Sequence, residues 1–474
     1  MEPGLNQAIS LFNYAFRKIP AYKDFLRRQK FKTSSITSLN DFQKIPITDK
    51  KNYVRNYKLK DFFPEKIPAV AYASSGSSGY PTFWFRDLQH EITGGRLHET
   101  IFKDIYQIKK SDRVLVVICF SMGVWIAGNY TATACRYLSD QGYNLTTITP
   151  GIEKEDIFNI LKTIAPQFDI LVLAGYPPFI MDILQDCTKL KINLPKKTKI
   201  LTAGDKFGET WRSEALKQCG RFTKPQDIVN LYGCADAAVL AFETPDSIGI
   251  RQQASQNHKL YAQLFGNEKK IPALFQYDPE HIFFEQVGQE LAFSTKTAIP
   301  LVRYNIHDIG RIISHNEMLG ILKQTGQPIS SKNKFNRQWP FIVKKGRTDV
   351  AVTFYALNIY PEHIQAGLDH KTINKYLSGN FLAVNDVDKK QQEKLYLHLE
   401  LSKKDLLNKK IVKKIQNKIL ETLNQVNGEF RKLRATIGAK SLPIFKFYPI
   451  NSSKFREYNK GLVYLKGKKP KILL

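Results

Sequence analysis

The sequence has few cysteines and no arrangement of them that indicates disulfides or a metal centre. Its five cysteines, among 474 residues, are odd in number and widely scattered, with neither a CxxC pair nor metal-ligand spacing. We therefore expect reduced thiols in a cytoplasmic protein. The chain also lacks any run of 18 or more apolar residues, which argues against a membrane-spanning helix. Its first basic residue is Arg17, so the N-terminal segment does not have the pattern of a secretory signal.

Negative charge is scarce by comparison with positive charge. The chain carries 71 Lys and Arg against 43 Asp and Glu, which gives a net charge of +28. An excess of this size is one mark of proteins that bind nucleic acid or anionic membranes. Here the excess is mostly lysine, is spread along the chain and accompanies no recognisable DNA- or RNA-binding motif. We therefore favour an enzyme with a lysine-rich surface, whose positive field attracts an anionic substrate such as a nucleotide, over a specific nucleic-acid partner.

Length and hydrophobic patterning predict an α/β protein of two domains. Hydrophobic residues make up 43% of the chain, enough for a large core, and 474 residues exceed what one compact core holds. After a helical segment over residues 5–60, apolar strand patterns alternate with helical patterns as far as residue 231, which is typical of a parallel sheet. Short strands between residues 273 and 314 indicate an antiparallel sheet or small barrel, with Asp308 between two of them. An α+β tail begins near residue 347, so we predict a large domain over 1–346 and a small one over 347–474.

A segment rich in serine and glycine, residues 73–82 (ASSGSSGYPT), is the most informative part of the chain. Short strand patterns flank it on both sides. Glycine lets the backbone approach a ligand closely, and successive N–H groups form an anion nest, so phosphate oxygens are natural ligands of such a loop. The segment is not a Walker A loop, because it lacks Gly-Lys-Ser/Thr. A surface hairpin turn that binds nothing is the alternative interpretation.

Four later segments extend the argument: 230–236 (NLYGCAD), 300–311 (PLVRYNIHDIGR), 345–349 (KGRTD) and 358–362 (NIYPE). The first puts Tyr232 and Asp236 at the end of a buried strand, where open α/β sheets bind ligands. Together with the serine–glycine segment, and in this order, they resemble the adenylate-forming superfamily of acyl-CoA ligases, most closely its phenylacetate–CoA ligase branch. The resemblance spans nearly the whole chain, because residues 20–22 and 39–50 look like that branch's N-terminal helical stretch.

The resemblance implies a role for each segment. The serine–glycine loop holds the β- and γ-phosphates of ATP, Asp236 holds Mg²⁺ as a hard cation, and Asp308 accepts hydrogen bonds from the ribose hydroxyls. Asp349 is the hinge on which the small domain turns. Lys468 neutralises charge during adenylation, with Lys460 as the runner-up and a solvated basic tail as the alternative. The nucleotide-binding residues implied in this way, with the Tyr232 ring stacked on adenine, are Ser74, Ser75, Gly76, Ser77, Ser78, Gly79, Thr82, Gly204, Asp205, Tyr232, Gly233, Asp308 and Arg347.

The implied reaction is the ATP-dependent activation of a carboxylic acid. The carboxylate attacks the α-phosphorus, the acyl-adenylate forms, and pyrophosphate leaves. Such chemistry depends on positioning and charge neutralisation more than on acid–base side chains. The acyl group then passes to an acceptor, which is coenzyme A, an amine or a carrier-protein thiol, and a homodimer is common in the branch. For the pocket of the acid we expect an apolar segment that follows a buried strand, with ordinary core packing as the alternative: Phe120, Met122, Gly123 and Trp125.

Four positions depart from the family's pattern. Tyr80 stands where a phosphate-loop lysine is usual, Asp236 where a glutamate is usual, and His307 and Ala356 where glycines are usual. The glycine at the last position lies beside the pantetheine tunnel in the family, so a specialised ligase with another acceptor fits as well as a coenzyme A ligase. These changes and the net charge of +28 keep a second class open, a catalytically degenerate protein that binds a nucleotide or a polyanion. The presence of Asp308 favours the enzyme.

Overall fold

The computed structural model describes residues 4–32, 36–74, 82–219, 224–268, 271–327, 337–347, 352–355, 357–388, 391–402, 408–453, 461–464 and 471–473. The chain divides into two compact units, and the division between them falls after residue 346. The first unit comprises residues 1–74 and 82–346 and the second comprises residues 347–474. In the part of the chain that is described, no helix is both long enough and apolar enough to cross a membrane. All five cysteines are free thiols.

The first unit is built on one mixed sheet of 11 strands in the order β10-β11-β12-β13-β9-β8-β7-β6-β5-β3-β4. The five strands from β7 to β4 run parallel, and β8 and the strands beyond it pair in antiparallel fashion wherever a register is defined. The strands have these bounds: β3 (Val114–Cys119), β4 (Leu145–Ile148), β5 (Ile170–Gly175), β6 (Lys197–Ala203), β7 (Ile228–Cys234), β8 (Ala238–Phe242), β9 (Ala273–Gln276), β10 (Ile282–Val287), β11 (Glu290–Thr295), β12 (Leu301–Ile313) and β13 (Phe341–Arg347).

This sheet confirms the predicted α/β class and corrects two details. The antiparallel strands do not form a separate small sheet, because β8 and β9 are hydrogen-bonded into the same sheet as the parallel strands. Asp308 does not lie between two strands, because β12 is one strand of 13 residues. The strand stays continuous through register shifts against β11, so its hydrogen bonding persists where the sequence suggested a break.

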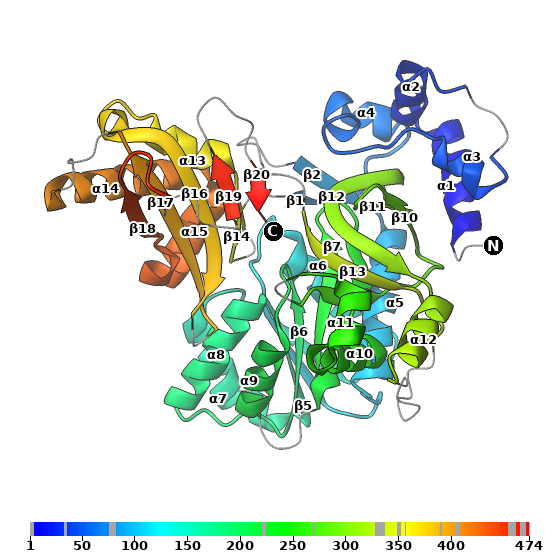
Figure 1. The fold of residues 1–474 in the computed structure, drawn as a ribbon. Helices are drawn as coiled ribbons and strands as arrows, with labels where there is room; N and C mark the ends of the chain where they lie inside the picture. Colours follow the sequence, from blue (N-terminus) through cyan, green and yellow to red (C-terminus); the bar gives the residue numbers. More distant parts are fainter. Residues whose placement is uncertain are drawn as a thin grey trace. The chain divides into compact units, whose positions relative to one another are not determined.

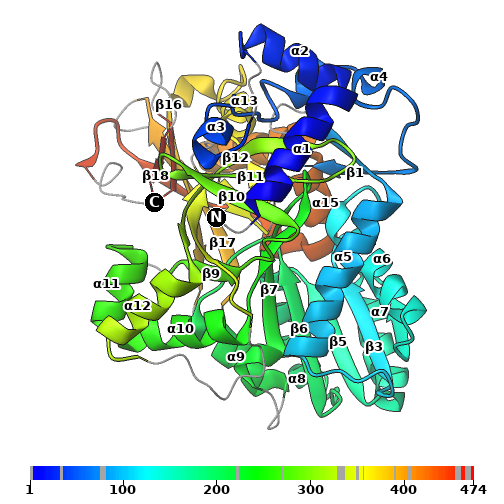
Figure 2. The ribbon, with the colours of Figure 1, turned by 90° about the vertical axis from the view of Figure 1, so that its right-hand side faces the viewer.

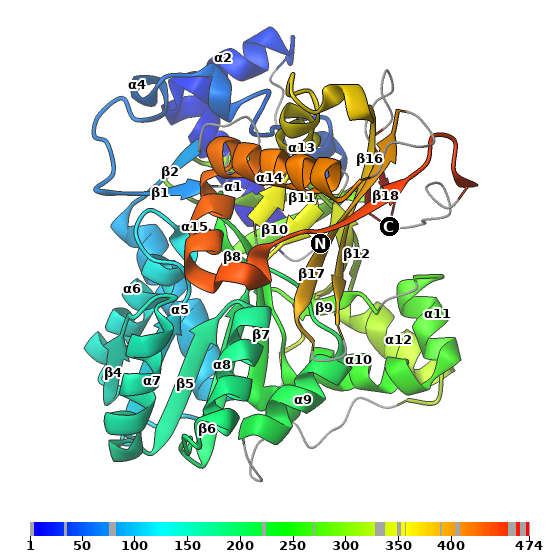
Figure 3. The ribbon, with the colours of Figure 1, turned by 90° about the vertical axis from the view of Figure 1, so that its left-hand side faces the viewer.

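Helices cover both faces of the parallel strands. Figure 2 shows α5 lying across them on one side, and Figure 3 shows α8 and α9 in front of them on the other. Strands β3 and β5 are buried along their whole length, which explains why their sequences are continuous apolar runs. The helices of the first unit are α1 (Leu5–Lys18), α2 (Pro20–Arg28), α3 (Leu39–Gln43), α4 (Leu59–Phe62), α5 (Leu88–Thr100), α6 (Ile126–Asp140), α7 (Lys154–Thr163), α8 (Pro177–Lys189), α9 (Glu209–Cys219), α10 (Pro245–Gln256), α11 (His258–Phe265) and α12 (His315–Gln324).

Helices α5 and α6 pack unusually closely because two adjacent glycines lie at their contact. A Cβ atom added to Gly94 would lie 2.1 Å from the hydroxyl oxygen of Tyr130, and one added to Gly95 would lie 2.4 Å from the ring of Tyr137. Both tyrosines belong to α6. The glycines therefore leave the space that the two tyrosine side chains fill.

Among the N-terminal helices, α1 packs on the antiparallel strands β10, β11 and β12, and α2 packs against α1 and α4 (Figure 1). Their inner faces supply aromatic side chains, among them Phe12, Tyr22, Phe25 and Phe62, to one hydrophobic core with side chains of β10, β11 and β12. After these helices contribute to the core, the chain reaches Thr48, which forms a parallel bridge with Tyr304 of β12. A separate hairpin follows, made of β1 (Val70–Ser74) and β2 (Thr82–Arg86).

The second unit has its own five-stranded sheet in the order β18-β17-β16-β19-β20 and its own core. Within it, α13 packs against α14, which buries Ile415, Ile419 and Leu423. Helix α14 begins at Lys409 because Asn408 caps it by accepting a hydrogen bond from the Ile411 N–H at 2.8 Å. The elements are β14 (Val352–Phe354), β15 (Leu357–Ile359), α13 (Pro361–Leu368), β16 (Leu377–Val387), β17 (Glu393–Leu401), α14 (Lys409–Val426), α15 (Gly428–Ile437), β18 (Ile444–Tyr448), β19 (Gly461–Tyr464) and β20 (Lys471–Leu473).

Candidate functional site

The two ends of the predicted phosphate loop are held together by the β1–β2 hairpin. Ser74 ends β1 opposite Thr82, which begins β2, and the Ser74 hydroxyl donates to the Thr82 carbonyl at 3.3 Å. The Lys50 ammonium donates to the same hydroxyl at 3.4 Å. The other residues predicted to hold phosphate, Ser75, Gly76, Ser77, Ser78 and Gly79, lie outside the described residues, as does Tyr80.

Asp236, the predicted magnesium ligand, is buried and faces a lysine. Its Oδ1 atom lies 3.3 Å from Lys50 Nζ, and its Oδ2 atom accepts a hydrogen bond from the Tyr304 hydroxyl at 2.7 Å. The Lys50 ammonium also lies 5.5 Å from the centre of the Trp84 ring, and Trp84 contacts Tyr304 edge to face. Lys50 thus joins the end of β1 to the acid that follows β7. No role for Lys50 was predicted, although it lies in a segment, residues 39–50, that carries the family resemblance.

The backbone at Asp236 is fixed by a buried arginine of β2. Arg86 Nη2 donates to the carbonyls of Ala235 and Asp236 at 2.5 Å and 3.1 Å. Burial lowers the pKa of Arg86, and the nearby Asp236 carboxylate partly opposes this effect. The strand that leaves the predicted phosphate loop therefore also positions the predicted metal ligand.

Tyr232 and Asp308, the predicted adenine and ribose residues, are hydrogen-bonded to each other. The Tyr232 hydroxyl donates to Asp308 Oδ2 at 2.5 Å, and Lys344 Nζ of β13 lies 3.6 Å from Asp308 Oδ1. The Lys344 ammonium lies 5.4 Å from the centre of the Tyr232 ring, which also stacks on Phe275 at 5.6 Å. An adenine that stacks on Tyr232 has to displace Lys344 from this place. The composition of residues 341–347 did not predict that Lys344 pairs with Asp308.

Both acids act electrostatically on the Cys234 thiol. Its pKa is raised first by burial, then by the Asp236 carboxylate and to a smaller degree by Asp308. A negative field from both carboxylates thus acts at the end of β7. This end of the sheet is the place where the sequence predicted ligand binding.

Three residues without glycine's freedom adopt a left-handed backbone around these acids. The φ angles are +60° at Ala238, +47° at Arg303 and +64° at His307. Such conformations are costly for side chains other than glycine and collect at functional sites. The angle at His307 gives a physical reason for the glycine that is usual at this place in the family. Its imidazole lies between Glu290 at 3.4 Å and Asp49 at 3.9 Å.

The loop from β6 to α9 contains two further predicted nucleotide residues. Gly204 has a φ of +99°. The Asp205 carbonyl accepts a hydrogen bond from Asn230 Nδ2 at 2.9 Å, and its carboxylate accepts one from the Tyr176 hydroxyl at 3.4 Å. Gly233, the remaining prediction in this region, leaves room for the β7–β8 turn, because a Cβ there would lie 2.4 Å from the Ala238 carbonyl oxygen.

The predicted acid pocket lies at the start of α6 and next to β1. The Ala73 N–H donates to the Val124 carbonyl at 2.8 Å, and Ala73 forms a bridge with Trp125. Phe120 is buried, Gly123 is exposed with a φ of +83°, and the Met122 side chain packs beside glycines of neighbouring segments. This segment therefore lies next to the strand that enters the predicted phosphate loop, and its role as a pocket stays a prediction.

Four predicted residues have no described side chain. Asp349 and Lys468, with its runner-up Lys460, lie outside the described residues. Arg347 is the last residue of β13, and its side chain is outside the described part of the chain.

The described residues fit a magnesium ion only as a partner of phosphate groups. Among them there is no group of three or more His, Cys, Asp and Glu side chains that could hold a metal ion by itself. Asp236 offers a single carboxylate, which already meets Tyr304 and Lys50. Magnesium in proteins is often held by one or two carboxylates together with substrate phosphates. Asp236 fits that arrangement if the Lys50 side chain moves away from its carboxylate.

The fold matches solved structures of an acyl-CoA ligase over most of both chains. A structure of 2-hydroxyisobutyryl-CoA ligase in complex with 2-HIB-AMP and CoA gives a TM-score of 0.64 at 15% identity, covering 94% of this chain and 86% of that one. Two further structures of that enzyme, one in the postadenylation state and one in an open conformation, give TM-scores of 0.52 and 0.51 at 14% identity, covering 94% of this chain and 85% and 88% of those chains. No protein-family model matches the sequence, and no curated protein matches it significantly. At these identities the comparison establishes the fold, which is that of an adenylate-forming ligase.

Proposed function

We propose that this protein is an ATP-dependent carboxylate ligase. It activates an organic acid as the acyl-adenylate, releases pyrophosphate and transfers the acyl group to coenzyme A or another acceptor. One observation carries the proposal: the residues that the family pattern assigns to phosphate, metal and ribose converge at the end of β7 in a chain with the fold of an acyl-CoA ligase. Ser74 and Asp236 share Lys50, and Tyr232 is bonded to Asp308.

Within the superfamily we assign the protein to the phenylacetate–CoA ligase branch. The support comes from the N-terminal segment that resembles this branch. Thr48 pairs with β12 through two backbone hydrogen bonds, from its N–H to the Arg303 carbonyl at 3.1 Å and from the Asn305 N–H to its carbonyl at 2.8 Å. This pairing brings Lys50 to Asp236. The segment is therefore part of the candidate site.

The chain's own residues perform positioning and charge neutralisation in this proposal. Ser74 and Thr82 fix the ends of the phosphate loop, and Lys50 supplies a positive charge beside it. Asp308 accepts hydrogen bonds from the ribose hydroxyls after exchanging Lys344 for them. These roles match a reaction that depends on positioning and on electrostatic stabilisation of phosphate charge. Asp236 would hold a Mg²⁺ ion that arrives with ATP and neutralises charge on the phosphates.

The second unit is the small C-terminal domain of such a ligase in our proposal. Residues 1–346 then form the adenylation domain, Asp349 is the hinge, and Lys468 contributes its charge during adenylation. The acceptor is coenzyme A, an amine or a carrier-protein thiol, and the acid binds next to Phe120, Met122, Gly123 and Trp125. The 2-hydroxyisobutyryl-CoA ligase structure, solved with an acyl-adenylate and CoA, supports coenzyme A as the first acceptor to test.

A second candidate function has an observation of its own. Both site acids already face a lysine, Asp236 with Lys50 and Asp308 with Lys344. Such pairing favours a protein that binds a nucleotide or polyanion without turning it over, because buried ion pairs that persist would keep the metal and the ribose from the two acids that the reaction needs. The net charge of +28 points the same way.

The substitution Asp308→Ala separates the two candidates. We expect it to abolish acid-dependent adenylate formation, measured as AMP release in the presence of an acyl acceptor, and to leave binding to a heparin column unchanged. Asp169→Ala is the matched control, because Asp169 forms an exposed ion pair with Arg113 and should leave both properties unchanged. Turnover that survives Asp308→Ala contradicts the ribose-binding role of Asp308, and a wild-type protein that binds heparin without any acid-dependent AMP release favours the second candidate.

A further inference from the structure

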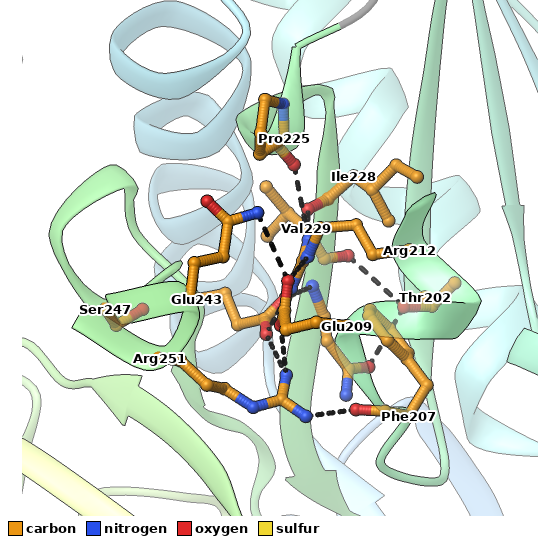
Figure 4. Close-up of polar contacts among 12 residues, drawn as sticks. Thr202, Phe207, Glu209, Arg212, Pro225, Ile228, Val229, Glu243, Ser247 and Arg251 are labelled. Carbon is orange, nitrogen blue, oxygen red and sulfur yellow. Dashed lines mark hydrogen bonds and ion pairs between the residues drawn. The ribbon is translucent and has the colours of Figure 1, made fainter. Parts of the chain in front are cut away.

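Four charged side chains form a closed network beneath the loop that joins β6 to α9. Glu209 and Arg212 come from α9, Glu243 follows β8, and Arg251 comes from α10 (Figure 4). The exposed fractions are 0% for Arg212 and 1% for both Glu243 and Arg251. Two arginines and two glutamates balance in charge, so the network can be buried without a net charge.

Every charged group in the network has a partner of opposite sign. Glu243 Oε1 lies 2.7 Å from Arg212 Nη2 and 3.1 Å from Arg251 Nη1. Glu209 meets Arg212 Nε at 3.0 Å and Arg251 Nη1 at 3.1 Å. Buried ion pairs are weak evidence for stability, because removing the ions from water offsets much of their attraction. The contacts of the network with the backbone indicate its role better than its ion pairs do.

The network holds two consecutive parts of the loop from its buried side. Arg251 Nη2 donates to the Phe207 carbonyl, and the Arg212 guanidinium lies 5.0 Å from the centre of the Phe207 ring. Glu243 Oε2 accepts the backbone N–H of Asn230 at 2.9 Å, and Asn230 Nδ2 donates to the Asp205 carbonyl at 2.9 Å. The carbonyls of Asp205 and Phe207 are thus fixed through Glu243 and Arg251.

The loop also has exposed residues. Gly204, Lys206 and Gly208 are exposed, whereas Phe207 is buried, and the Lys206 ammonium donates to the Lys345 carbonyl at 2.6 Å. Gly204 and Asp205 are the residues that the family resemblance assigns to the adenine. The loop is therefore held from its buried side by the network, and its exposed glycines leave backbone beside which a nucleotide base can bind.

We propose that Arg251 is a positioning residue for the nucleotide. It holds the Phe207 carbonyl, and in this way it fixes the shape of the loop at residues 204–208 on which the nucleotide binds. This inference rests on the proposed function. A lysine could not replace Arg251, because the guanidinium serves three directions in one plane: Nε donates to the Pro272 carbonyl at 3.0 Å, Nη1 to Glu243, and Nη2 to Phe207. Because the loop is already ordered before the nucleotide binds, the binding free energy does not include the entropic cost of ordering it.

The test compares Arg251→Met and Arg251→Lys with Tyr106→Phe in the full chain. Tyr106→Phe is the control for lost stability, because the Tyr106 hydroxyl donates at 2.7 Å to the Ile200 carbonyl of β6, a residue outside the loop at 204–208. We expect Arg251→Met to raise KM for ATP in ATP–pyrophosphate exchange about tenfold or more and to change kcat by less than about twofold. Arg251→Lys should be intermediate and provides the measurement if Arg251→Met does not fold. Tyr106→Phe should lower the melting temperature and leave KM unchanged.

Amide hydrogen exchange of residues 204–208, measured without nucleotide, makes the inference independent of activity. We expect faster exchange there in Arg251→Met or Arg251→Lys than in Tyr106→Phe. Equal KM values and equal exchange in all variants would overturn the inference. If the wild-type protein shows no acid-dependent ATP–pyrophosphate exchange, the proposed function fails, and the amide measurement still decides whether Arg251 orders the loop.

Discussion

At the scale of single residues, the candidate site consists of acids that each face a lysine. Asp236 lies 3.3 Å from Lys50, and Asp308 lies 3.6 Å from Lys344. A buried carboxylate is costly unless a charge or hydrogen bond compensates it, so these lysines stabilise the site without a ligand. A nucleotide has to compete with them. Lys50 is also the only residue of this set that contacts Ser74 at the predicted phosphate loop.

The substitution Lys50→Met should weaken the binding of ATP. It removes the ammonium beside Ser74 and leaves the Asp236 carboxylate with Tyr304 but without its cationic partner, and a hydrogen bond to a charged group is worth about 1.5–3 kcal/mol. We therefore expect KM for ATP to rise about 10- to 100-fold in pyrophosphate exchange. Lys51→Met is the matched control, because Lys51 is the exposed neighbour and should leave KM unchanged. An unchanged KM in Lys50→Met would exclude Lys50 from the nucleotide site.

His90 makes the stability of the first unit depend on pH. Burial and the Arg86 guanidinium lower the pKa of His90 to about 3, from an ordinary value of 6.5. The folded protein therefore binds fewer protons than the unfolded chain below pH 6.5, and stability is lost as the pH falls from 6.5 towards 3. At pH 5 the loss from this group is about 2 kcal/mol. Urea unfolding at pH 7.5 and pH 5 should show a smaller loss for His90→Gln than for the wild-type protein, and equal losses would contradict the pKa shift.

His307 shows what single residues could not reveal from the sequence. The sequence places a histidine where the family usually has glycine, and on that basis alone the change looked unfavourable. The backbone at His307 is left-handed, with a φ of +64°, and the imidazole lies beside Glu290 and Asp49. Glu290 belongs to the neighbouring strand β11, whereas Asp49 comes from the distant N-terminal segment. The sequence therefore identified His307 as an unusual residue, and only the fold shows which acids surround it.

At the scale of elements, the contact between α5 and α6 depends on glycine. We expect Gly94→Ala to lower the free energy of unfolding by about 1–3 kcal/mol, because the new methyl group meets the Tyr130 hydroxyl and a packed core accommodates extra atoms poorly. Gly249→Ala in α10 is the matched control. No atom lies within 4 Å of a Cβ at Gly249, so helix propensity alone acts and should raise the free energy by about 0.5–1 kcal/mol. Chemical denaturation measures both changes, and a stabilising Gly94→Ala would mean that α5 and α6 do not pack closely.

The elements that the sequence predicted are those with an apolar pattern. The apolar pattern predicts strands over residues 114–120 and 170–174 and a helix over 126–137, and β3, β5 and α6 begin at these residues and end within three residues of the predicted ends. Helix α10 was missed because the residues it buries include Asp246, Ser247 and Arg251, which a search for apolar periodicity does not count. Helix α5 was missed for a related reason, since two glycines form part of its buried face. A helix that buries polar or small residues is invisible until its partners are known.

At the scale of the whole molecule, the order of weak motifs predicted more than any one of them. Five segments in family order indicated the fold that the acyl-CoA ligase structures share. The pairing of the strands could not be predicted in the same way. Strand β13 pairs with β9, some 70 residues earlier, and lies between β9 and β12 in the sheet. This pairing brings Lys344 to Asp308, so the residues missed at the site are those that long-range pairing supplies.

ATP–pyrophosphate exchange tests the central claim most directly. The wild-type protein would be assayed with Mg²⁺ and a panel of aryl, fatty and amino acids, without an added acceptor, with Asp308→Ala run in parallel. The account predicts exchange that depends on one class of acid and that disappears in Asp308→Ala. The absence of exchange across the whole panel, in a protein that still binds ATP, would contradict the assignment as a ligase and favour a nucleotide-binding protein without this chemistry.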